Sequence, residues 1–571
     1  MFSTIPRDAH QFMDWSWSNF EPYYLDLIDH PLDAENLDDW LSDWSLLSEM
    51  IFEINQRLYV AITSDTTDQD AEERFNTYLD KLYPPSQAAD QSLKQKFLAS
   101  GLQPPNFEIP MCVLRAEAAI FHPDNLPLLG KEMKLSAEYD KITGAQTVMW
   151  EGLEKTLAEL QVVYFDHDRT RREMAWRLAA DRQLADRQAI NDLWVDFTRL
   201  RQEIARNANL PDYRAYRWQQ LLRFDYTPAD CVQFHHSIEQ VAVPAALRCY
   251  ERRRVRLGLE RLRPWDLNVN PDGCPPLHPF SQVDELESKA GHIFYQVDPQ
   301  LAGYYQLMRQ EGLLDLDNRK GKAPGGYCLY FPVSRRPFIF MNAVGINDDV
   351  QTILHEAGHA FHVFEITHLP YFQQRRVGLE FAEVASMAME LFCAPYLEMD
   401  KGGFYSPQDA ARARLEYLEF VVTFWPYMAV VDAFQHWVYE NIAAACQPAN
   451  CNQKWAELWQ RYMPGVDWDG LEQEMMTGWQ RKLHIPEVPF YYIEYGLAQL
   501  GALQVWRNAR RDQPTALAAY RHALSLGGTA SLPQLYAAAG ARLAFDTDTL
   551  KEAIDLIEET IEELEAVLSR P

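Results

Sequence analysis

The sequence predicts a mainly α-helical protein with two lobes and one small β-element. Helical periodicity dominates the chain, and no internal repeat or low-complexity tract interrupts it. The chain has 571 residues, of which 47% are hydrophobic and 13% aromatic, which is enough for a large core or two packed lobes. A turn at residues 207–211 separates a helical N-terminal lobe, residues 1–205, from a C-terminal domain, residues 206–571.

Four segments predict where helices end, begin or lie buried. Residues 103–110 are rich in proline and break the N-terminal lobe, and residues 264–279 form the clearest long loop. Thr549 and Glu552 have the spacing of a capping box ahead of an amphipathic closing helix. The apolar run at residues 420–431 is shorter than the roughly 20 helical residues that cross a bilayer, so it predicts a core helix.

The β-element is expected between residues 327 and 342. Two short runs of β-forming residues flank Ser334-Arg335-Arg336, which predicts a hairpin. Gly325 and Gly326 give the approach to the first strand conformational freedom. A free strand edge would hold an extended peptide through backbone hydrogen bonds, which makes Gly325, Gly326 and Tyr327 candidate substrate-binding residues. The alternative is an ordinary structural hairpin.

The next predicted helix contains the motif His355-Glu356-Ala357-Gly358-His359. Imidazoles four residues apart lie on one side of a helix, where both reach a single Zn²⁺, and a glutamate beside the first is placed to act on water. His362 shares that face, and we expect it to support the ligands rather than bind the metal. The alternative is a buried amphipathic helix whose histidines bond to their neighbours.

The residues around this motif favour a helix that another element approaches closely. Asn347 is a candidate N-cap, followed by two acids where the helix dipole favours negative charge. Gly358 costs the helix about 1 kcal/mol relative to alanine. A glycine between two candidate ligands is easier to understand if a neighbour packs against it.

A catalytic zinc usually takes three protein ligands, so a further carboxylate is needed. Residues 378–392 predict a second helix that carries Glu380, Glu383 and Glu390. Glu380 is interpreted as a solvated acid near the helix start. Glu383 and Glu390 are seven residues apart on one face, so one can bind metal while the other orients a ligand histidine. Their spacing does not decide between them.

With these residues in view, the chain resembles the oligoendopeptidase F and thimet oligopeptidase family of zinc peptidases, especially its shorter bacterial members such as the PZ-peptidases. The likeness covers most of residues 205–571, and its strongest segments are residues 321–328, 336–362, 379–392, 484–502 and 526–540. It implies a two-lobed, neurolysin-like zincin with a deep, narrow cleft that admits oligopeptides and excludes folded proteins.

The resemblance also assigns roles to residues. It implies one Zn²⁺ per chain held by His355, His359 and Glu383, with Glu356 as general base. A late segment of the family holds the oxyanion with a histidine and tyrosines, and the similar positions here are His484, Tyr491, Tyr492 and Tyr495. Tyr492 is also a candidate substrate contact. The choice among the tyrosine hydroxyls stays open, and an aromatic core cluster is the alternative.

The expected function is that of a cytoplasmic zinc endopeptidase acting on short peptides. The alternatives are an exopeptidase of the same chemistry, similar to a dipeptidyl carboxypeptidase, and a catalytically silent peptide-binding protein. A net charge of −29 argues against nucleic acid or an anionic membrane as a partner. Eight cysteines without a CxxC pair, and an N-terminus without a visible secretion signal, favour the cytosol. We expect a monomer or a homodimer.

Overall fold

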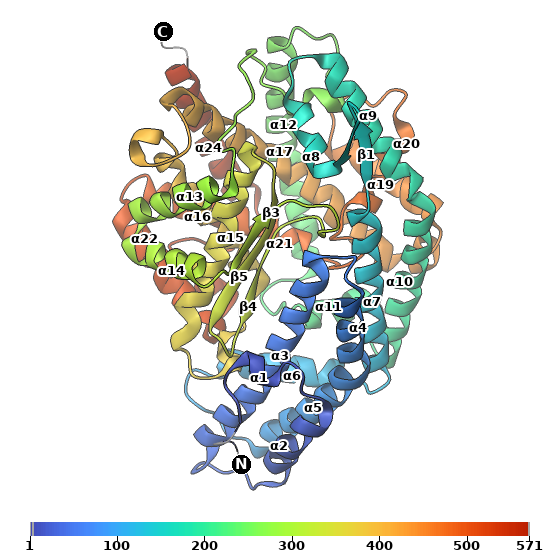
Figure 1. Cartoon of the computed structure of the whole chain (residues 1–571), viewed down its shortest axis with the longest axis vertical. Helices are drawn as coiled ribbons and strands as arrows, with labels where there is room; N and C mark the ends of the chain where they lie inside the picture. Colours follow the sequence, from blue (N-terminus) through green and yellow to red (C-terminus); the bar gives the residue numbers. More distant parts are fainter. Residues whose placement is uncertain (1, 3–4, 569–571) are drawn as a thin grey trace.

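Long helices make up most of the structure, and the β-strands are confined to two small sheets (Figure 1). This computed structural model describes residue 2 and residues 5–568. The mainly helical fold with one small sheet beside the histidine helix is as the sequence predicted.

The N-terminal helices are, in order, α1 (Ala9–Phe12), α2 (Trp17–Asp29), α3 (Leu37–Ser64), α4 (Gln69–Thr77), α5 (Tyr83–Ser100), α6 (Glu108–Ile120), α7 (Asn125–Gly144), α8 (Leu157–Gln161), α9 (Arg169–Ala185) and α10 (Arg187–Asn207). Helices α2 to α6 enclose a core of their own, in which Trp40 and Trp44 pack on Phe97. The predicted proline-rich break is shorter than expected. Pro110 lies in the first turn of α6, where a missing N–H leaves no hydrogen bond unmade.

A hairpin in the N-terminal half was not predicted from the sequence. Strand β1 (Thr147–Trp150) pairs antiparallel with β2 (Leu153–Thr156). Glu151 and Gly152 join them with φ of 52° and 83°, the left-handed conformation that two-residue hairpin turns require. Trp150 is buried in a small separate cluster with residues of α9.

The C-terminal helices are α11 (Tyr213–Gln220), α12 (Pro228–Arg256), α13 (Val283–Val297), α14 (Pro299–Gln310), α15 (Asn347–Glu365), α16 (Leu379–Cys393), α17 (Pro407–Glu440), α18 (Ile442–Ala445), α19 (Pro448–Tyr462), α20 (Glu472–Met476), α21 (Tyr492–Ala509), α22 (Gln513–Ser525), α23 (Leu532–Ala538) and α24 (Thr547–Leu568). They share one large core, which also takes in Trp194 and Ile204 of α10. A turn follows α10 as predicted, but α10 itself packs into the larger core. The division into domains at residue 205 stays a prediction.

The predicted hairpin beside the histidine helix is confirmed. Strand β4 (Tyr327–Phe331) pairs antiparallel with β5 (Arg336–Ala343), with Tyr327 opposite Phe340. Strand β3 (Leu314–Asp317) pairs parallel with β5 on its other side, so the order is β3-β5-β4. Strand β4 is therefore an edge of the sheet, and α15 lies against β4 and β5 (Figure 1).

Two helices begin at residues other than those predicted. Asn347 is the first residue of α15 rather than its N-cap, and the carboxylate of Asp349 accepts hydrogen bonds from the backbone N–H groups of residues 344, 345 and 346. Thr549 lies inside α24, where its own N–H donates to Asp546 at 2.9 Å. At the start of each helix, backbone N–H groups donate to an acidic side chain rather than to the predicted Asn347 or Thr549.

The apolar run of residues 420–431 lies within α17. This helix is long and apolar enough to cross a membrane, but 67% of its most apolar 18-residue stretch is buried inside the fold. Val421, Trp425 and Val431 are fully enclosed. The prediction of a core helix is confirmed.

Candidate active site

Helices α15 and α16 touch backbone to backbone at Gly358. A Cβ atom added to Gly358 would lie 2.6 Å from Cα of Ser386 and 2.7 Å from the carbonyl oxygen of Ala385, closer than side chains approach. The expected close neighbour of this glycine is therefore α16. The approach brings the acidic face of α16 within reach of both histidines of α15.

Three metal-binding side chains converge at this crossing. Nε2 of His355 lies 3.3 Å and Nε2 of His359 lies 3.5 Å from Oε2 of Glu383. One donor atom from each of the three residues lies within 4.8 Å of the other two. Two imidazole nitrogens and one carboxylate oxygen are a common set of protein ligands at a catalytic zinc, which leaves a fourth position for water or substrate.

The charges of the group also suit a cation. Glu383 is buried, which opposes its ionisation, yet the two imidazoles hold its pKa well below the usual value. Burial alone would lower the pKa of His355, but the adjoining carboxylates of Glu383 and Glu390 raise it well above the usual value. The site thus favours positive charge between an anionic carboxylate and two ring nitrogens, and a divalent metal fits it.

The second carboxylate of α16 lies on the outer side of the group. Oε1 of Glu390 is 2.7 Å from Nδ1 of His355. A carboxylate can only accept there, so Nδ1 carries a proton, and Nε2 is the nitrogen that faces Glu383 and would bind a metal. Of the two arrangements that spacing left open, the structure has Glu383 with the imidazole Nε2 atoms and Glu390 behind His355.

Glu380 is not the solvated residue that the sequence indicated. It is buried, accepts a hydrogen bond from the hydroxyl of Tyr226 at 2.6 Å, and lies 3.6 Å from the guanidinium of Arg223. Its carboxylate fixes α16 to the segment before α12.

Glu356 lies outside the group of three donors. Its side chain is buried, and Oε2 has no hydrogen-bond partner among the described residues. Burial raises its pKa, although the nearby imidazoles act in the opposite direction. A Cβ on Gly326 would lie 3.5 Å from Oε1, so the glycine leaves room beside the carboxylate. An unpaired carboxylate with a raised pKa, open to a cavity, has the properties of a general base.

A histidine and three tyrosines lie next to the three donors. The hydroxyl of Tyr491, at the N-cap of α21, donates to Oε1 of Glu383 at 2.6 Å. The hydroxyl of Tyr495 lies 3.1 Å from Nε2 of His484, and the ring of Tyr492 packs edge-on against His484. Burial and the ammonium of Lys482 lower the pKa of His484 well below the usual value, so its imidazole is neutral.

A cleft of about 600 Å³ lies beside the group. Its wall includes His355, Glu356 and Gly326 together with His484, Tyr492 and Tyr495. A second cavity of about 470 Å³ shares Gly326 with the first and also includes Gly325. Gly325 has φ of 99°, a backbone conformation that favours glycine.

The side chains of two predicted residues make contacts away from the three donors. The hydroxyl of Tyr327 is 2.6 Å from Oγ1 of Thr63, and its ring stacks on Phe340, so its side chain joins α3 to the sheet. We therefore do not retain that side chain as a substrate contact. His362 is buried edge-on against Phe381, and burial lowers its pKa to about 3. It lies outside the group of three donors, as expected, but within the described residues no hydrogen bond joins it to them.

The match to protein families is consistent with this geometry. The model of Peptidase family M3 matches residues 163–554, more than two thirds of the chain. The chain belongs to peptidase family M3. It is thus a metallopeptidase, and the predicted relationship to oligoendopeptidase F and the PZ-peptidases is confirmed.

Solved structures extend the match of this M3 peptidase over the whole chain. PZ peptidase A with an inhibitor superposes with a TM-score of 0.91 at 27% identity, over 99% of each chain. A protein assigned as oligoendopeptidase F superposes with a TM-score of 0.90 at 26% identity, over 95% of this chain and 96% of the other. A further such protein from Bacillus anthracis str. Ames, at 24% identity, has the same fold with a TM-score of 0.86. Comparison with curated protein sequences gave no match.

Several residues of the M3 peptidase's site were not predicted from the sequence. Ser386 donates to Oε2 of Glu383 at 3.1 Å and lies one helical turn beyond it, a spacing that could have drawn attention to it. Phe420, Thr423 and Phe424 line the cleft from one face of α17. Their spacing of three and four residues is visible in the sequence, but the apolar run around them favours the core.

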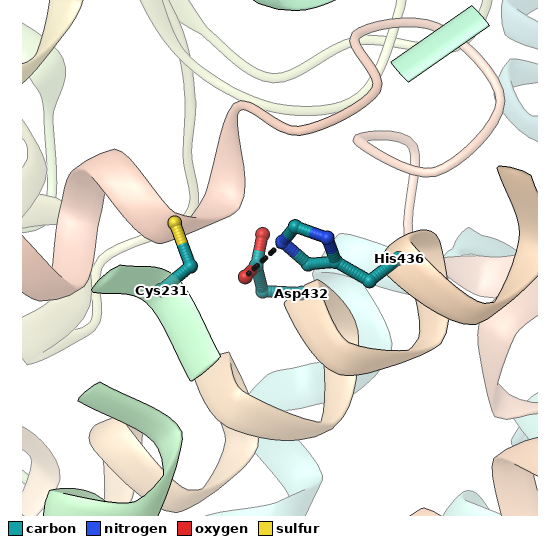
Figure 2. Close-up of side chains that lie close together, drawn as sticks. All are labelled: Cys231, Asp432 and His436. Atoms are coloured by element: carbon teal, nitrogen blue, oxygen red, sulfur yellow. Dashed lines mark ion pairs between the residues drawn. The ribbon is translucent and has the colours of Figure 1, made fainter. Parts of the chain in front are cut away.

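A second group of potential ligands lies between α12 and α17, comprising Cys231, Asp432 and His436 (Figure 2). It has the properties of a structural contact. The guanidinium of Arg214 donates to Nδ1 of His436, so Nε2 carries the proton and points toward Asp432 rather than offering a lone pair. Asp432 also accepts from His235 at 2.8 Å, and burial keeps the thiol of Cys231 protonated by raising its pKa. The group holds two core helices together.

Proposed function

We propose that this M3 peptidase is a zinc-dependent endopeptidase that cleaves internal bonds of short oligopeptides. One Zn²⁺ per chain would be held by His355, His359 and Glu383. The observation that carries the proposal is the position of Glu356, an unpaired buried carboxylate beside three converging donors in a peptide-sized cleft.

The chemistry divides between the metal and the side chains. When bound, Zn²⁺ supplies a Lewis acid that polarises both the attacking water and the scissile carbonyl. Glu356 takes a proton from the water as it attacks and later delivers that proton to the leaving amine nitrogen. Its raised pKa makes the carboxylate a stronger base toward water than an exposed glutamate, and the protonated form can then donate to the amine.

Tyr495 is the best placed of the tyrosines to stabilise the oxyanion. Its hydroxyl lies in the cleft wall and has no carboxylate partner among the described residues, whereas the hydroxyl of Tyr491 is already bonded to Glu383. His484 is neutral and 3.1 Å from Tyr495, so it orients that hydroxyl. A single donor of this kind contributes about 10²–10³ to turnover.

Substrate size follows from the shape of the cleft. A cavity of about 600 Å³ accommodates a few residues of an extended peptide but not a folded domain. Edge strand β4 leads into it through Gly326, so backbone hydrogen bonds to β4 would hold a peptide with little dependence on its side chains.

The proposed compartment is the cytoplasm, with short peptides as partners and neither nucleic acid nor membrane. All eight cysteines are free thiols, including Cys446 and Cys451, which suits a reducing environment. The net charge of −29 opposes binding to polyanions. A monomer or a homodimer remains the prediction, and light scattering after size-exclusion chromatography measures it.

Peptide cleavage with metal analysis tests the proposal. Purified protein should contain one zinc per chain, lose activity with a chelator, and cut a peptide blocked at both ends at an internal bond. Mass spectrometry of the products separates this from an exopeptidase, which would need a free terminus. Cleavage that persists without metal, or no cleavage of any peptide by zinc-loaded enzyme, would overturn the proposal.

A further inference from the structure

Lys482 is a half-buried cation in the wall of the cleft, two residues before His484. Its Nζ lies 4.5 Å from the ring centre of Tyr492 and 5.7 Å from that of Tyr427. No ion pair or side-chain hydrogen bond of this ammonium occurs within residues 5–568. Aromatic faces are its only favourable neighbours there.

Other basic residues around the two cavities have hydrogen-bond acceptors within the protein. Arg253 lies 3.4 Å from Glu419 and donates to the carbonyl of Val269, and Lys322 lies 2.9 Å from Asp315. Arg481 donates to the carbonyl of Glu474. Lys482 differs from these three, because its charge is left facing the space that a substrate would enter.

An unpaired charge that has lost part of its water is unfavourable unless something else compensates it. Stacking on two tyrosine rings offsets part of that cost but leaves all three N–H donors without an acceptor. An anionic group on a bound peptide would supply the acceptors. In a protein with net charge −29, such a local cation is also the feature that would draw a carboxylate into the cleft.

Building on the proposed function, we propose that Lys482 binds a carboxylate of the peptide substrate. This carboxylate is either the C-terminus of the peptide or the side chain of an aspartate or glutamate. Lys482 and His484 lie on one short segment, and His484 contacts Tyr495 beside the donor group. The separation between the ammonium and the bond being cut is therefore fixed, so cleavage should fall at a set number of residues from the recognised carboxylate.

Binding measurements test this without relying on turnover. Glu356→Gln protein would be titrated with one fluorescent peptide in three forms: free C-terminal acid, C-terminal amide, and amide with an internal glutamate. A charge-assisted hydrogen bond predicts that one of the acid forms binds about tenfold or more tightly than the neutral form. The form that does so identifies the source of the carboxylate.

The same titration in Glu356→Gln/Lys482→Met should show no difference between the acid and neutral forms. Lys551→Met, at an exposed lysine of α24 paired with Asp555, is the matched control and should keep the preference. Cleavage sites mapped in otherwise unmodified Lys482→Met enzyme should lose their fixed distance from the carboxylate. A preference for an acid form that survives Lys482→Met, or no such preference in the Glu356→Gln parent, overturns the inference. If zinc-loaded wild type cleaves no peptide at all, that result counts against the proposed function instead.

Discussion

Glu390 lies behind His355, with its Oε1 atom 2.7 Å from Nδ1 of the imidazole. That contact sets which nitrogen faces Glu383 and fixes the plane of the ring. Glu390→Gln keeps an acceptor but removes the charge, and we expect zinc affinity to fall about tenfold; Glu390→Ala removes both, and the loss should approach a hundredfold. Competition with a coloured chelator measures both.

The control for this series is Glu398→Gln. Glu398 pairs with Lys401 beyond the end of α16 and lies outside the group of three donors, so its replacement should leave zinc affinity unchanged. Equal affinities for wild type and Glu390→Ala would show that the contact does not support the ligand.

Glu356→Gln should retain zinc and fold but lose turnover. The side chain lies outside the donor group, and its Oε2 has no partner to lose, so the neutral amide replaces it without a structural cost. An amide cannot accept the water proton, which removes the base. Metal content, thermal stability and peptide-cleavage rates measured on one preparation test this, and a Glu356→Gln enzyme that still cleaves peptides would refute the assignment.

Tyr491→Phe and Tyr495→Phe should have different consequences. Removing the Tyr491 hydroxyl takes a hydrogen bond from Oε1 of Glu383, so zinc binding should weaken. Removing the Tyr495 hydroxyl leaves Glu383 untouched, so kcat should fall about 10²–10³-fold at unchanged zinc affinity. Each variant is the control for the other. A Tyr495→Phe enzyme with normal kcat would move the oxyanion role elsewhere in the cleft.

Much of this site could be predicted from the sequence, because periodicity and motif spacing report on single elements. The histidines share a face of α15 by helix geometry alone, and the hairpin at β4 and β5 follows from local propensity. The choice between Glu383 and Glu390 could not be made, because it depends on how α15 crosses α16. Both carboxylates lie on the same face of α16, and only the close contact at Gly358 determines which reaches the imidazole Nε2 atoms.

Other features escaped prediction for similar reasons. The hairpin of β1 and β2 is short, and its exposed Met149 and Leu153 disguise the alternation typical of strands. Lys482 carries no sequence signal, since its lack of an acceptor depends on which elements surround it in space. Buried carboxylates such as Glu380 looked solvated because their partners, Tyr226 and Arg223, lie far away in the sequence.

The preference for carboxylate-bearing peptides should depend on pH. Burial lowers the pKa of Lys482 to about 8, so its side chain is charged below that pH and neutral above it. The groups that face it do not titrate in this range: burial raises the pKa of Tyr427 to about 12 and that of Tyr492 well above the usual value, and His484 is already neutral.

The ratio of kcat/KM for acid and amide forms of one peptide is the appropriate measure, because the ionisation of Glu356 cancels from it. We expect the ratio to be constant well below pH 8 and to fall toward unity as the pH rises through about 8. In Lys482→Met the ratio should be near unity throughout. A ratio in wild type that does not change between pH 6 and 9.5 would exclude Lys482 as the group that binds the carboxylate.

Gly358→Ala should separate α15 from α16 and disperse the metal ligands. The added methyl would lie 2.6 Å from a backbone carbon of Ser386. A backbone atom cannot move aside as a flexible side chain can, so the helices must move apart. Overpacking of this kind costs about 3 kcal/mol, more than the roughly 1 kcal/mol that alanine contributes to a helix. Zinc affinity should fall together with stability, because Glu383 moves with α16.

Gly303→Ala in α14, where a Cβ meets no atom within 4 Å, is the matched control and should be neutral or stabilising. Chemical denaturation and zinc titration of both variants decide the matter: a Gly358→Ala protein as stable and as tight for zinc as wild type would mean that this backbone contact does not hold the ligands in place.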